Sequence, residues 1–103
     1  MKPPSLKKII KAVCVYYNFK ESDMKSSSQA RLLSRARGEV GWLAFELGAG
    51  SLTEAAGCFG RDTATLSRIV GNINKQARMS SDYRASLEKV KRLAIGYNCI
   101  MQA

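Results

Sequence analysis

The sequence contains no histidine, and its three cysteines, Cys14, Cys58 and Cys99, are far apart and form no C-x-x-C pair. Protein zinc sites are built largely from cysteine and histidine, and the Ser-His-Asp and Cys-His centres both need a histidine. The sequence therefore excludes these metal sites and these nucleophiles. Its glycines form neither G-x-x-x-x-G-K-[ST] nor G-x-G-x-x-G, the phosphate-binding loops of nucleotide-binding proteins. We expect no enzymatic activity, no metal and no small-molecule cofactor.

The chain also lacks an apolar run of about eighteen residues, the length needed to cross a bilayer. Its longest uncharged stretch, Leu93 to Ala103, is too short, and lysines interrupt the N-terminal region where a secretory signal needs apolar residues. Cys14 and Cys58 fall within expected helices, as the small hydrophobic cysteines of cytosolic proteins usually do. We therefore expect a cytoplasmic protein without a membrane partner.

Acidic residues are scarce: eight Asp and Glu stand against seventeen Lys and Arg, which gives a net charge of +9 and a pI near 9.8. Residues 1–37 carry nine basic and two acidic side chains, and residues 61–103 carry eight and three. Residues 38–60 contain three glutamates and neither Lys nor Arg. The central segment is therefore expected in the core, while both flanks supply positive surface that attracts nucleic acids. Charge alone does not distinguish DNA from RNA.

Apolar residues recur at helical spacing along most of the chain, which predicts an all-α fold of five to six helices. The length fits one domain with a modest core. Within residues 1–103 we expect a tail at 1–4, a first helix at 5–18, a central helix at 34–48, a helix-turn-helix at 51–78 and a C-terminal helix at 82–98. A turn with a short helical piece is expected from Asn18 to Lys25, before a polar, basic connection that ends at Arg31.

Two of these helices carry further expectations. The central helix is apolar on more than one side, because Trp42 and Phe45 lie off its main stripe, so neighbours are expected to enclose it. Trp42 is then a core residue rather than a base-stacking platform. Asp82 is expected to cap the last helix, in which Tyr83, Leu87, Val90, Ala94 and Tyr97 form a stripe. That stripe docks onto the core or, as the alternative, binds a partner helix.

Residues 51 to 78 are the most informative segment. Ser51 and Glu54 form an S-x-x-E capping box, which satisfies free N–H groups at the start of a helix. Gly60 suits a tight helix end because it tolerates positive φ, and Asp62 offers a side-chain oxygen to cap a second helix. Two helices joined by a turn of three or four residues that contains glycine are typical of a helix-turn-helix, which places its second helix in a DNA groove.

The second helix of this motif has one apolar and one polar face. Its apolar stripe comprises Leu66, Ile69, Val70, Ile73 and Ala77. At about 100° per residue, the opposite face carries Ala64, Arg68, Gly71 and Lys75, with Thr63, Thr65 and Ser67 beside it in the first turns. Small side chains let the backbone approach base edges, threonine methyls meet thymine methyls, and arginine suits guanine or phosphate. A solvated surface helix in an ordinary helical bundle is the alternative interpretation.

The order of several short motifs resembles the C-terminal DNA-binding domain, domain IV, of the bacterial replication initiator DnaA. These motifs are Y-Y-N-F-x-x-x-D-M, R-A-R, L-A-x-E-L, S-L-x-E and F-G-R-D-x-x-T-L, and the resemblance spans roughly residues 5–93. It implies an all-helical fold, similar to DnaA domain IV and to Trp-repressor-like folds, that binds double-stranded DNA as a monomer. In that family the recognition helix enters the major groove, and a basic loop reaches the neighbouring minor groove.

The resemblance assigns roles to individual residues. The base-reading R-D-H-T-T signature of the family falls on Arg61, Asp62, Thr63, Ala64 and Thr65. Leu52 and Thr53 fall where a helix N-terminus donates to phosphate. Arg37 matches a phosphate-contacting arginine, and Arg31 and Arg35 lie in the basic loop region. Gln29 stands about where the family has its minor-groove arginine, and Arg31 is expected to substitute for it.

The sequence also departs from the family pattern. Thr63 replaces the signature histidine, Ala64 replaces the first threonine, one glycine is missing before Arg61, and Ala36 replaces a proline. These changes alter the base-reading tip more than the scaffold. The sequence looks closer to DnaA-type domains appended to transposase-like proteins, where an R-D-x-x-T-L-S form is common. That resemblance implies a transposase-related DNA-binding module whose catalytic domain lies outside this chain, and the alternative is an origin-binding domain of a replication initiator.

Three hypotheses follow. The first is sequence-specific binding of double-stranded DNA through Thr65, Ser67, Arg68 and Lys75 together with the residues that the resemblance assigns. The second is a non-specific basic nucleic-acid-binding protein, which any polyanion would compete for. The third is a helical protein-interaction module that uses the Tyr83–Tyr97 stripe.

Overall fold

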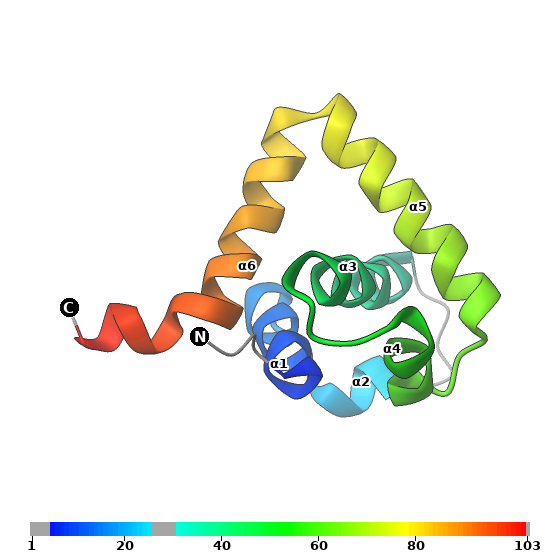
Figure 1. The fold of residues 1–103 in the computed structure, drawn as a ribbon, viewed down its shortest axis with the longest axis horizontal. Helices are drawn as coiled ribbons and strands as arrows, with labels where there is room; N and C mark the ends of the chain where they lie inside the picture. Colours follow the sequence, from blue (N-terminus) through cyan, green and yellow to red (C-terminus); the bar gives the residue numbers. More distant parts are fainter. Residues whose placement is uncertain (1–4, 26–30, 103) are drawn as a thin grey trace.

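The computed structural model describes the backbone of residues 5–25 and 31–102 and the side chains up to Ile95. Within these residues it contains helices and no strand, which confirms the all-α prediction. In chain order the helices are α1 (Leu6–Tyr17), α2 (Glu21–Lys25), α3 (Arg31–Leu47), α4 (Leu52–Phe59), α5 (Thr63–Met79) and α6 (Ser81–Gln102) (Figure 1). The tail at 1–4 and most of the expected basic connection, with Gln29, lie outside the described residues.

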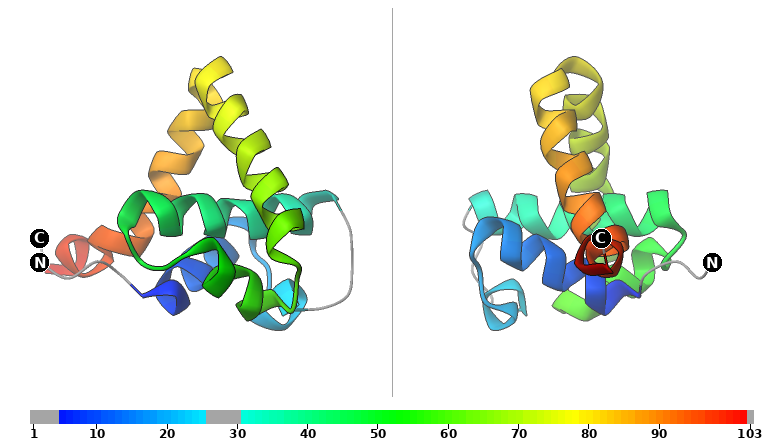
Figure 2. Two further views of the ribbon diagram at one scale, coloured as in Figure 1. Left: turned by 45° about the vertical axis from the view of Figure 1, so that its right-hand side comes forward. Right: turned by 90° about the vertical axis from the view of Figure 1, so that its left-hand side faces the viewer.

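The long helices α5 and α6 form the two sides of an inverted V, and α3 crosses beneath its apex (Figures 1 and 2). Helices α1, α2 and α4 lie on the other side of α3. Helix α3 packs against α1, α2, α4 and α5, whereas α6 packs against α1 and α5. The central helix is therefore the scaffold on which the helix-turn-helix is mounted.

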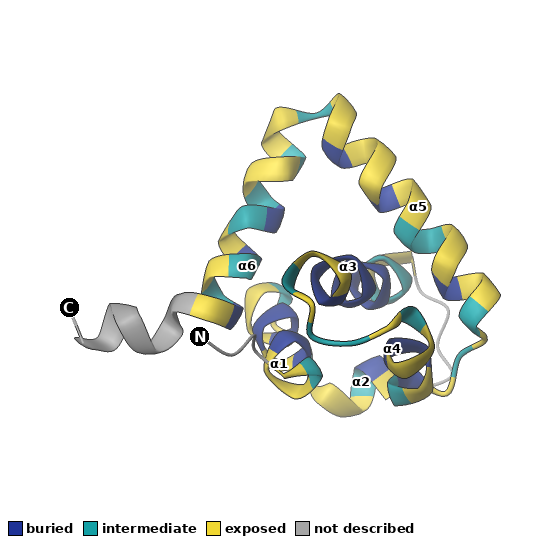
Figure 3. Ribbon diagram, viewed as in Figure 1, coloured by how far each residue is buried: buried dark blue, intermediate teal, exposed yellow. Residues whose placement is uncertain are grey.

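The core follows the apolar stripes that the sequence indicates. Burial is complete, at 0% exposure, for Ile9 and Val13 of α1, Met24 of α2 and Leu43 of α3. On α5 and α6 the buried residues face inward, toward the other helices (Figure 3). Leu87, Val90 and Ala94 of the C-terminal stripe are buried, so this part of the stripe docks onto the core, while the Tyr97 side chain lies outside the described residues.

A single residue joins α5 to α6 at the apex of the V. The N–H of Ser80 donates to the Gln76 carbonyl of α5 at 2.9 Å, and its own carbonyl accepts from the Arg84 N–H of α6 at 3.1 Å. The Ser80 hydroxyl also accepts from the Tyr83 N–H at 3.2 Å, which is an N-cap bond. The expectation that Asp82 caps α6 is therefore wrong: the helix begins earlier, and Asp82 lies in its first turn.

Two expectations about the central helix need correction. It begins at Arg31 rather than Ser34, so Arg31 and Arg35 belong to a helix and not to a loop. Trp42 is buried at 6% exposure, as expected, and its Nε1 donates to Asn74 Oδ1 at 3.3 Å. Phe45, however, is 78% exposed, because the helices that pack against α3 leave this side of it uncovered.

A buried carboxylate joins three helices. Glu39 of α3 is 1% exposed and accepts hydrogen bonds from the hydroxyls of Tyr17 of α1, at 2.7 and 2.9 Å, and Tyr83 of α6, at 2.7 Å. Arg35 forms an ion pair with Glu39 at 3.6 Å and lies 4.2 Å from the centre of the Tyr83 ring. Burial raises the pKa of Glu39, while the two phenols and Arg35 act in the opposite direction. These contacts fix α1 and α6 on α3.

Among the described helices, none combines the length and the apolar character that a membrane crossing would need.

Candidate nucleic-acid interface

Helix α4 begins with the expected capping box. The Ser51 hydroxyl accepts from the Glu54 N–H at 3.1 Å, and the Glu54 carboxylate accepts from the Ser51 N–H at 3.1 Å. The free N–H groups that remain in the first turn lie beside Leu52, which is half-buried, and Thr53, which is exposed. This end of α4 can therefore donate to an anion such as a phosphate.

The turn between α4 and α5 is closed by Gly60, whose φ of 62° lies in the left-handed region. Its N–H donates back to carbonyls of α4, and the Arg61 N–H donates to the Ala56 carbonyl at 2.9 Å. Asp62 occupies the N-cap position of α5 with extended backbone, but its side chain makes no capping bond. The expectation of a side-chain cap is thus wrong: the Asp62 carboxylate is exposed and does not turn back onto the helix.

Helix α5 is seated in a notch of α3 made by Gly38 and Gly41. A Cβ on Gly41 would lie 2.8 Å from Val70 Cγ2, and a Cβ on Gly38 would lie 2.5 Å from Ile73 Cδ1 and would also clash with Ile69. On the same apolar face of α5, Leu66 packs with Ala55 and Ala56 of α4. The small residues of α3 and α4 bring α5 close and fix the direction of its outer face.

The outer face of α5 carries the residues that the sequence assigns to it. The exposed residues of this face are Ala64, Thr65, Ser67, Arg68, Gly71, Asn72 and Lys75, and Thr63 is half-buried. Leu66, Ile73 and Ala77 are buried on the opposite face, with Ile69 and Val70 partly buried beside them. The predicted orientation of the second helix is therefore confirmed. From Thr63 to Met79 the helix contains no carboxylate, so the whole outer face is neutral or positive.

A hollow between α3 and the start of α5 gathers three arginines from three segments. Its lining comprises Ser34 and Arg37 of α3, Arg61 of the turn, and Thr65, Leu66, Arg68 and Ile69 of α5. The lining has two hydroxyls and no carboxylate, which is the composition of a site for a phosphate or another anion. The structure thus brings together Arg37, Arg61, Thr65 and Arg68 from the predicted set.

Arg37 is only 2% exposed and is held from inside the protein. Its Nε donates to the Met24 carbonyl at 2.8 Å, and its Nη2 donates to the Asp23 carbonyl at 3.4 Å. Burial, and then the charge of nearby Arg61, lower the pKa of Arg37. The Arg37 side chain therefore anchors α2 to α3. Because Arg37 is almost completely buried beneath the hollow, it can attract an anion there by its charge but offers little surface for direct contact.

The two arginines at the start of α3 differ in their surroundings. Arg31 is exposed in the first turn, directly after the segment 26–30 that lies outside the described residues. Arg35 is engaged by Glu39 and the Tyr83 ring. Its Nε is buried without a hydrogen-bond partner, although it lies 3.6 Å from Glu39 Oε2. Arg31 is thus placed to contact a ligand, whereas Arg35 is partly exposed and held by Glu39 and Tyr83.

Three features of this interface were not recognised in the sequence. Asn72 shares the outer face with Arg68, and the helical spacing of four residues is a signal that could have identified it. Ser34 enters the hollow from α3, which no local pattern indicates. The notch of Gly38 and Gly41 has the spacing of neighbouring turns on one helix face, but its partner on α5 is set by tertiary packing.

A comparison with protein families agrees with this geometry. The family model described as bacterial dnaA protein helix-turn-helix matches residues 6–73. The matched region contains α1 to α4 and the first part of α5, including the notch, the hollow and the N-terminal end of α5.

Proposed function

The chain belongs to the family of bacterial DnaA protein helix-turn-helix domains and carries the DNA-binding unit of that family; on this premise we propose that it binds double-stranded DNA sequence-specifically through α4 and α5. The observation that carries the proposal is the outer face of α5, which is exposed, free of carboxylates, small at its N-terminal end and basic further along. A helix with these properties fits the major groove, where each base pair presents its own pattern of donors and acceptors.

The first turn of α5 is the base-reading end in this proposal. Thr63, Ala64 and Thr65 are small, so the helix backbone can approach the bases, and their methyl groups can contact thymine. Arg68 lies one turn further along the same face, within reach of guanine. Asp62 makes no capping bond, and its carboxylate can accept from the amino group of cytosine. Asn72 adds a side chain of the type that pairs with adenine.

Phosphate contacts surround this end and set the register of the protein on the duplex. Leu52 and Thr53 present backbone N–H groups from the start of α4, and Arg61 and the hollow supply positive charge between α3 and α5. Lys75 and Ser67 lie on or beside the outer face of α5. Arg31, at the start of α3, extends the basic surface and is the candidate for a contact in the minor groove. Arg37 and Arg35 contribute indirectly, because they hold the neighbouring helices in place.

Within this family, we favour a transposase-related module over an origin-binding domain of a replication initiator. The support is the changed signature: Thr63 and Ala64 replace the histidine and the first threonine, and the turn is one glycine shorter. Both replacements lie at the base-reading end of α5, so they alter the sequence read while the scaffold of α3 and α4 is kept. The chain binds as a monomer, and any catalytic domain lies outside these residues.

A competition experiment tests the proposal against non-specific binding of polyanions. A fluorescein-labelled duplex, bound by residues 1–103 at about 0.15 M salt, is competed with unlabelled duplex, single-stranded DNA and heparin. The proposal predicts that the duplex competes far better than single-stranded DNA of equal charge. Equal competition by all three polyanions would instead support a general nucleic-acid-binding protein.

A further inference from the structure

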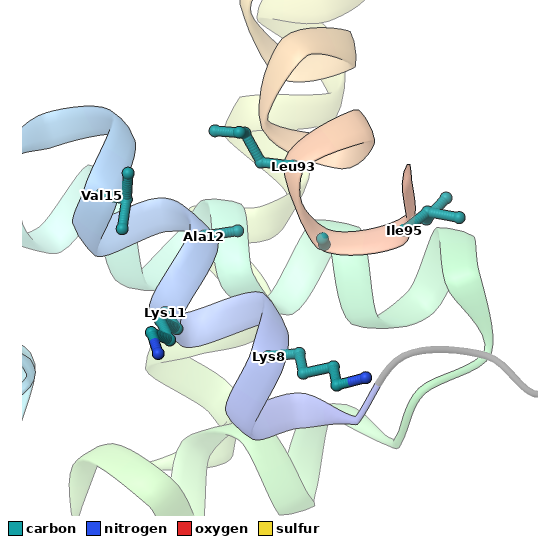
Figure 4. A pocket seen from close by; sticks show the side chains of 7 residues that line it. Lys8, Lys11, Ala12, Val15, Leu93 and Ile95 are labelled. Carbon is teal, nitrogen blue, oxygen red and sulfur yellow. The ribbon is translucent and has the colours of Figure 1, made fainter. Parts of the chain in front are cut away.

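A groove between α1 and the C-terminal part of α6 is the second distinctive surface of the protein. Lys8, Lys11, Ala12 and Val15 of α1 line one side of it, and Leu93, Ala94 and Ile95 of α6 line the other (Figure 4). Val15 is 63% exposed and Ile95 is 43% exposed, although both are aliphatic. The groove shares no residue with the hollow that faces DNA and none with the outer face of α5.

The floor and the rim of the groove differ in chemistry. Ala12 and Ala94 are nearly buried and form an apolar floor, and Val15 and Ile95 stand open beside them. The polar side chains of the rim are Lys8 and Lys11, and no carboxylate lines the groove among the described residues. Helix α1 carries Lys7, Lys8 and Lys11 and no Asp or Glu. An apolar channel beside a row of ammonium groups selects a ligand that is apolar on one side and negative at its edges.

The dimensions of the groove indicate the form of that ligand. From Lys8 to Val15 the lining residues of α1 follow a spacing of three, four and seven, which is one face of two helical turns, roughly 10 Å long. Two turns of a bound amphipathic helix have this length, so aliphatic anchors on one of its faces can lie along the groove. We propose that this groove is a docking site for an acidic amphipathic helix of a partner protein, whose aliphatic anchors contact Val15 and Ile95 and whose carboxylates pair with Lys8 and Lys11.

Because the groove lies on α1 and α6, and the DNA-facing residues lie on α3, α4 and α5, the two surfaces can be occupied together. The protein would then hold a partner protein at the DNA site to which it is bound. This inference does not depend on sequence-specific reading of DNA.

The test uses the full chain and two labelled peptides of about fourteen residues, or four helical turns. Both carry leucines at helical spacing; one has glutamates at the edges of the apolar face, and the other has lysines at the same positions. Fluorescence anisotropy should show saturable binding of the glutamate peptide and none of the lysine peptide. In nuclear magnetic resonance spectra of the labelled protein, the shifted amide signals should be those of residues 8–15 and 93–95.

Variants with matched controls locate the site. Val15→Asp should weaken binding of the glutamate peptide at least about tenfold, as truncation of a central apolar anchor does at interfaces. Phe45→Asp is the control, because Phe45 is exposed but lies outside the groove, and it should bind like the parent. Lys8→Glu and Lys11→Glu should each weaken binding about two- to fivefold, and Lys7→Glu should have a smaller effect.

Several results would overturn the proposal. These are no saturable binding of the glutamate peptide, equal binding of the two peptides, equal weakening by Val15→Asp and Phe45→Asp, and a dimer in sedimentation that Val15→Asp abolishes, which would make a second copy the occupant. Binding to anionic lipid vesicles that depends on Val15, without binding of the peptide, would assign the groove to membranes and also contradict the proposal.

Discussion

Gly41 of α3 and Val70 of α5 meet where no larger residue than glycine fits, since a Cβ on Gly41 would lie 2.8 Å from Val70 Cγ2. Gly38, one turn earlier, has the same relationship to Ile69 and Ile73. Protein interiors are close-packed, so an added methyl group must displace either the facing side chain or one of the two helices. The position of the proposed recognition helix is therefore set by glycines on the central helix.

Replacing Gly41 tests this relationship. Gly41→Ala should lower the free energy of unfolding by about 1–3 kcal/mol, through overpacking against Val70, and should weaken DNA binding by displacing α5. Urea unfolding followed by circular dichroism and anisotropy with a duplex measure the two effects. Gly57→Ala is the control: nothing lies within 4 Å of its added Cβ on α4, so it should stabilise the protein by up to about 1 kcal/mol. If the Gly41→Ala protein is as stable as the Gly57→Ala protein, the claim that Val70 leaves no room for a side chain at position 41 is wrong.

The base-reading role of α5 predicts a change in specificity rather than a uniform decrease in affinity. Thr65→Ala and Arg68→Ala should each reduce discrimination between a preferred and a mismatched duplex by about 1–3 kcal/mol for each base that the side chain no longer reads. Arg84→Ala removes one exposed charge on α6, away from this face, and should leave discrimination unchanged. Unchanged affinity and unchanged specificity in both α5 variants would remove this assignment.

Alanine variants of Arg37 and Lys75 should differ in their effects, because Arg37 is held inside the protein and Lys75 is proposed to contact phosphate. Arg37→Ala leaves the Met24 carbonyl without its buried donor, so it should lower the free energy of unfolding by about 1–3 kcal/mol. Lys75→Ala, on the exposed face, should change stability by less than about 0.5 kcal/mol. It should instead reduce the slope of log K against log salt by about 0.9, the effect of one phosphate contact. If Arg37→Ala keeps full stability and lowers the salt slope, the arginine contacts phosphate directly.

Alkaline pH should destabilise the fold through Tyr17 and Tyr83. Burial and hydrogen bonding to Glu39 raise the pKa of both phenols well above the ordinary value near 10, so they stay protonated in the folded protein. Above pH of about 10 the unfolded chain releases these protons and the folded chain does not, so the free energy of unfolding should fall as pH rises. Urea unfolding between neutral and alkaline pH measures the slope, which should be smaller in Tyr17→Phe. A free energy that stays constant through this range would contradict the buried cluster.

The local signals of the sequence predicted the helix-turn-helix well. A capping box and a glycine helix end depend on a few adjacent residues, and Ser51, Glu54 and Gly60 take the expected roles. The apolar stripe of α5 likewise predicted which side of the helix is exposed, because a long periodic pattern specifies one buried face.

Expectations that depended on tertiary surroundings were less successful. Asp62 precedes α5 without forming a side-chain cap, and at the start of α6 the capping bond is made by Ser80 and not by Asp82. Phe45 is exposed because none of the described helices covers its side of α3. The burial of Glu39 could not be predicted, because its partners Tyr17 and Tyr83 come from helices far away in the sequence.

The most direct test of sequence-specific reading is a binding selection by residues 1–103 from a random duplex library at physiological salt, followed by sequencing. Sequence-specific reading predicts an enriched motif of several base pairs, and the likeness of that motif to an initiator box would distinguish a replication role from a mobile-element role. The same selection with Arg68→Ala should lose part of that motif. A bound pool without any enriched motif would contradict the account and leave only attraction to phosphate.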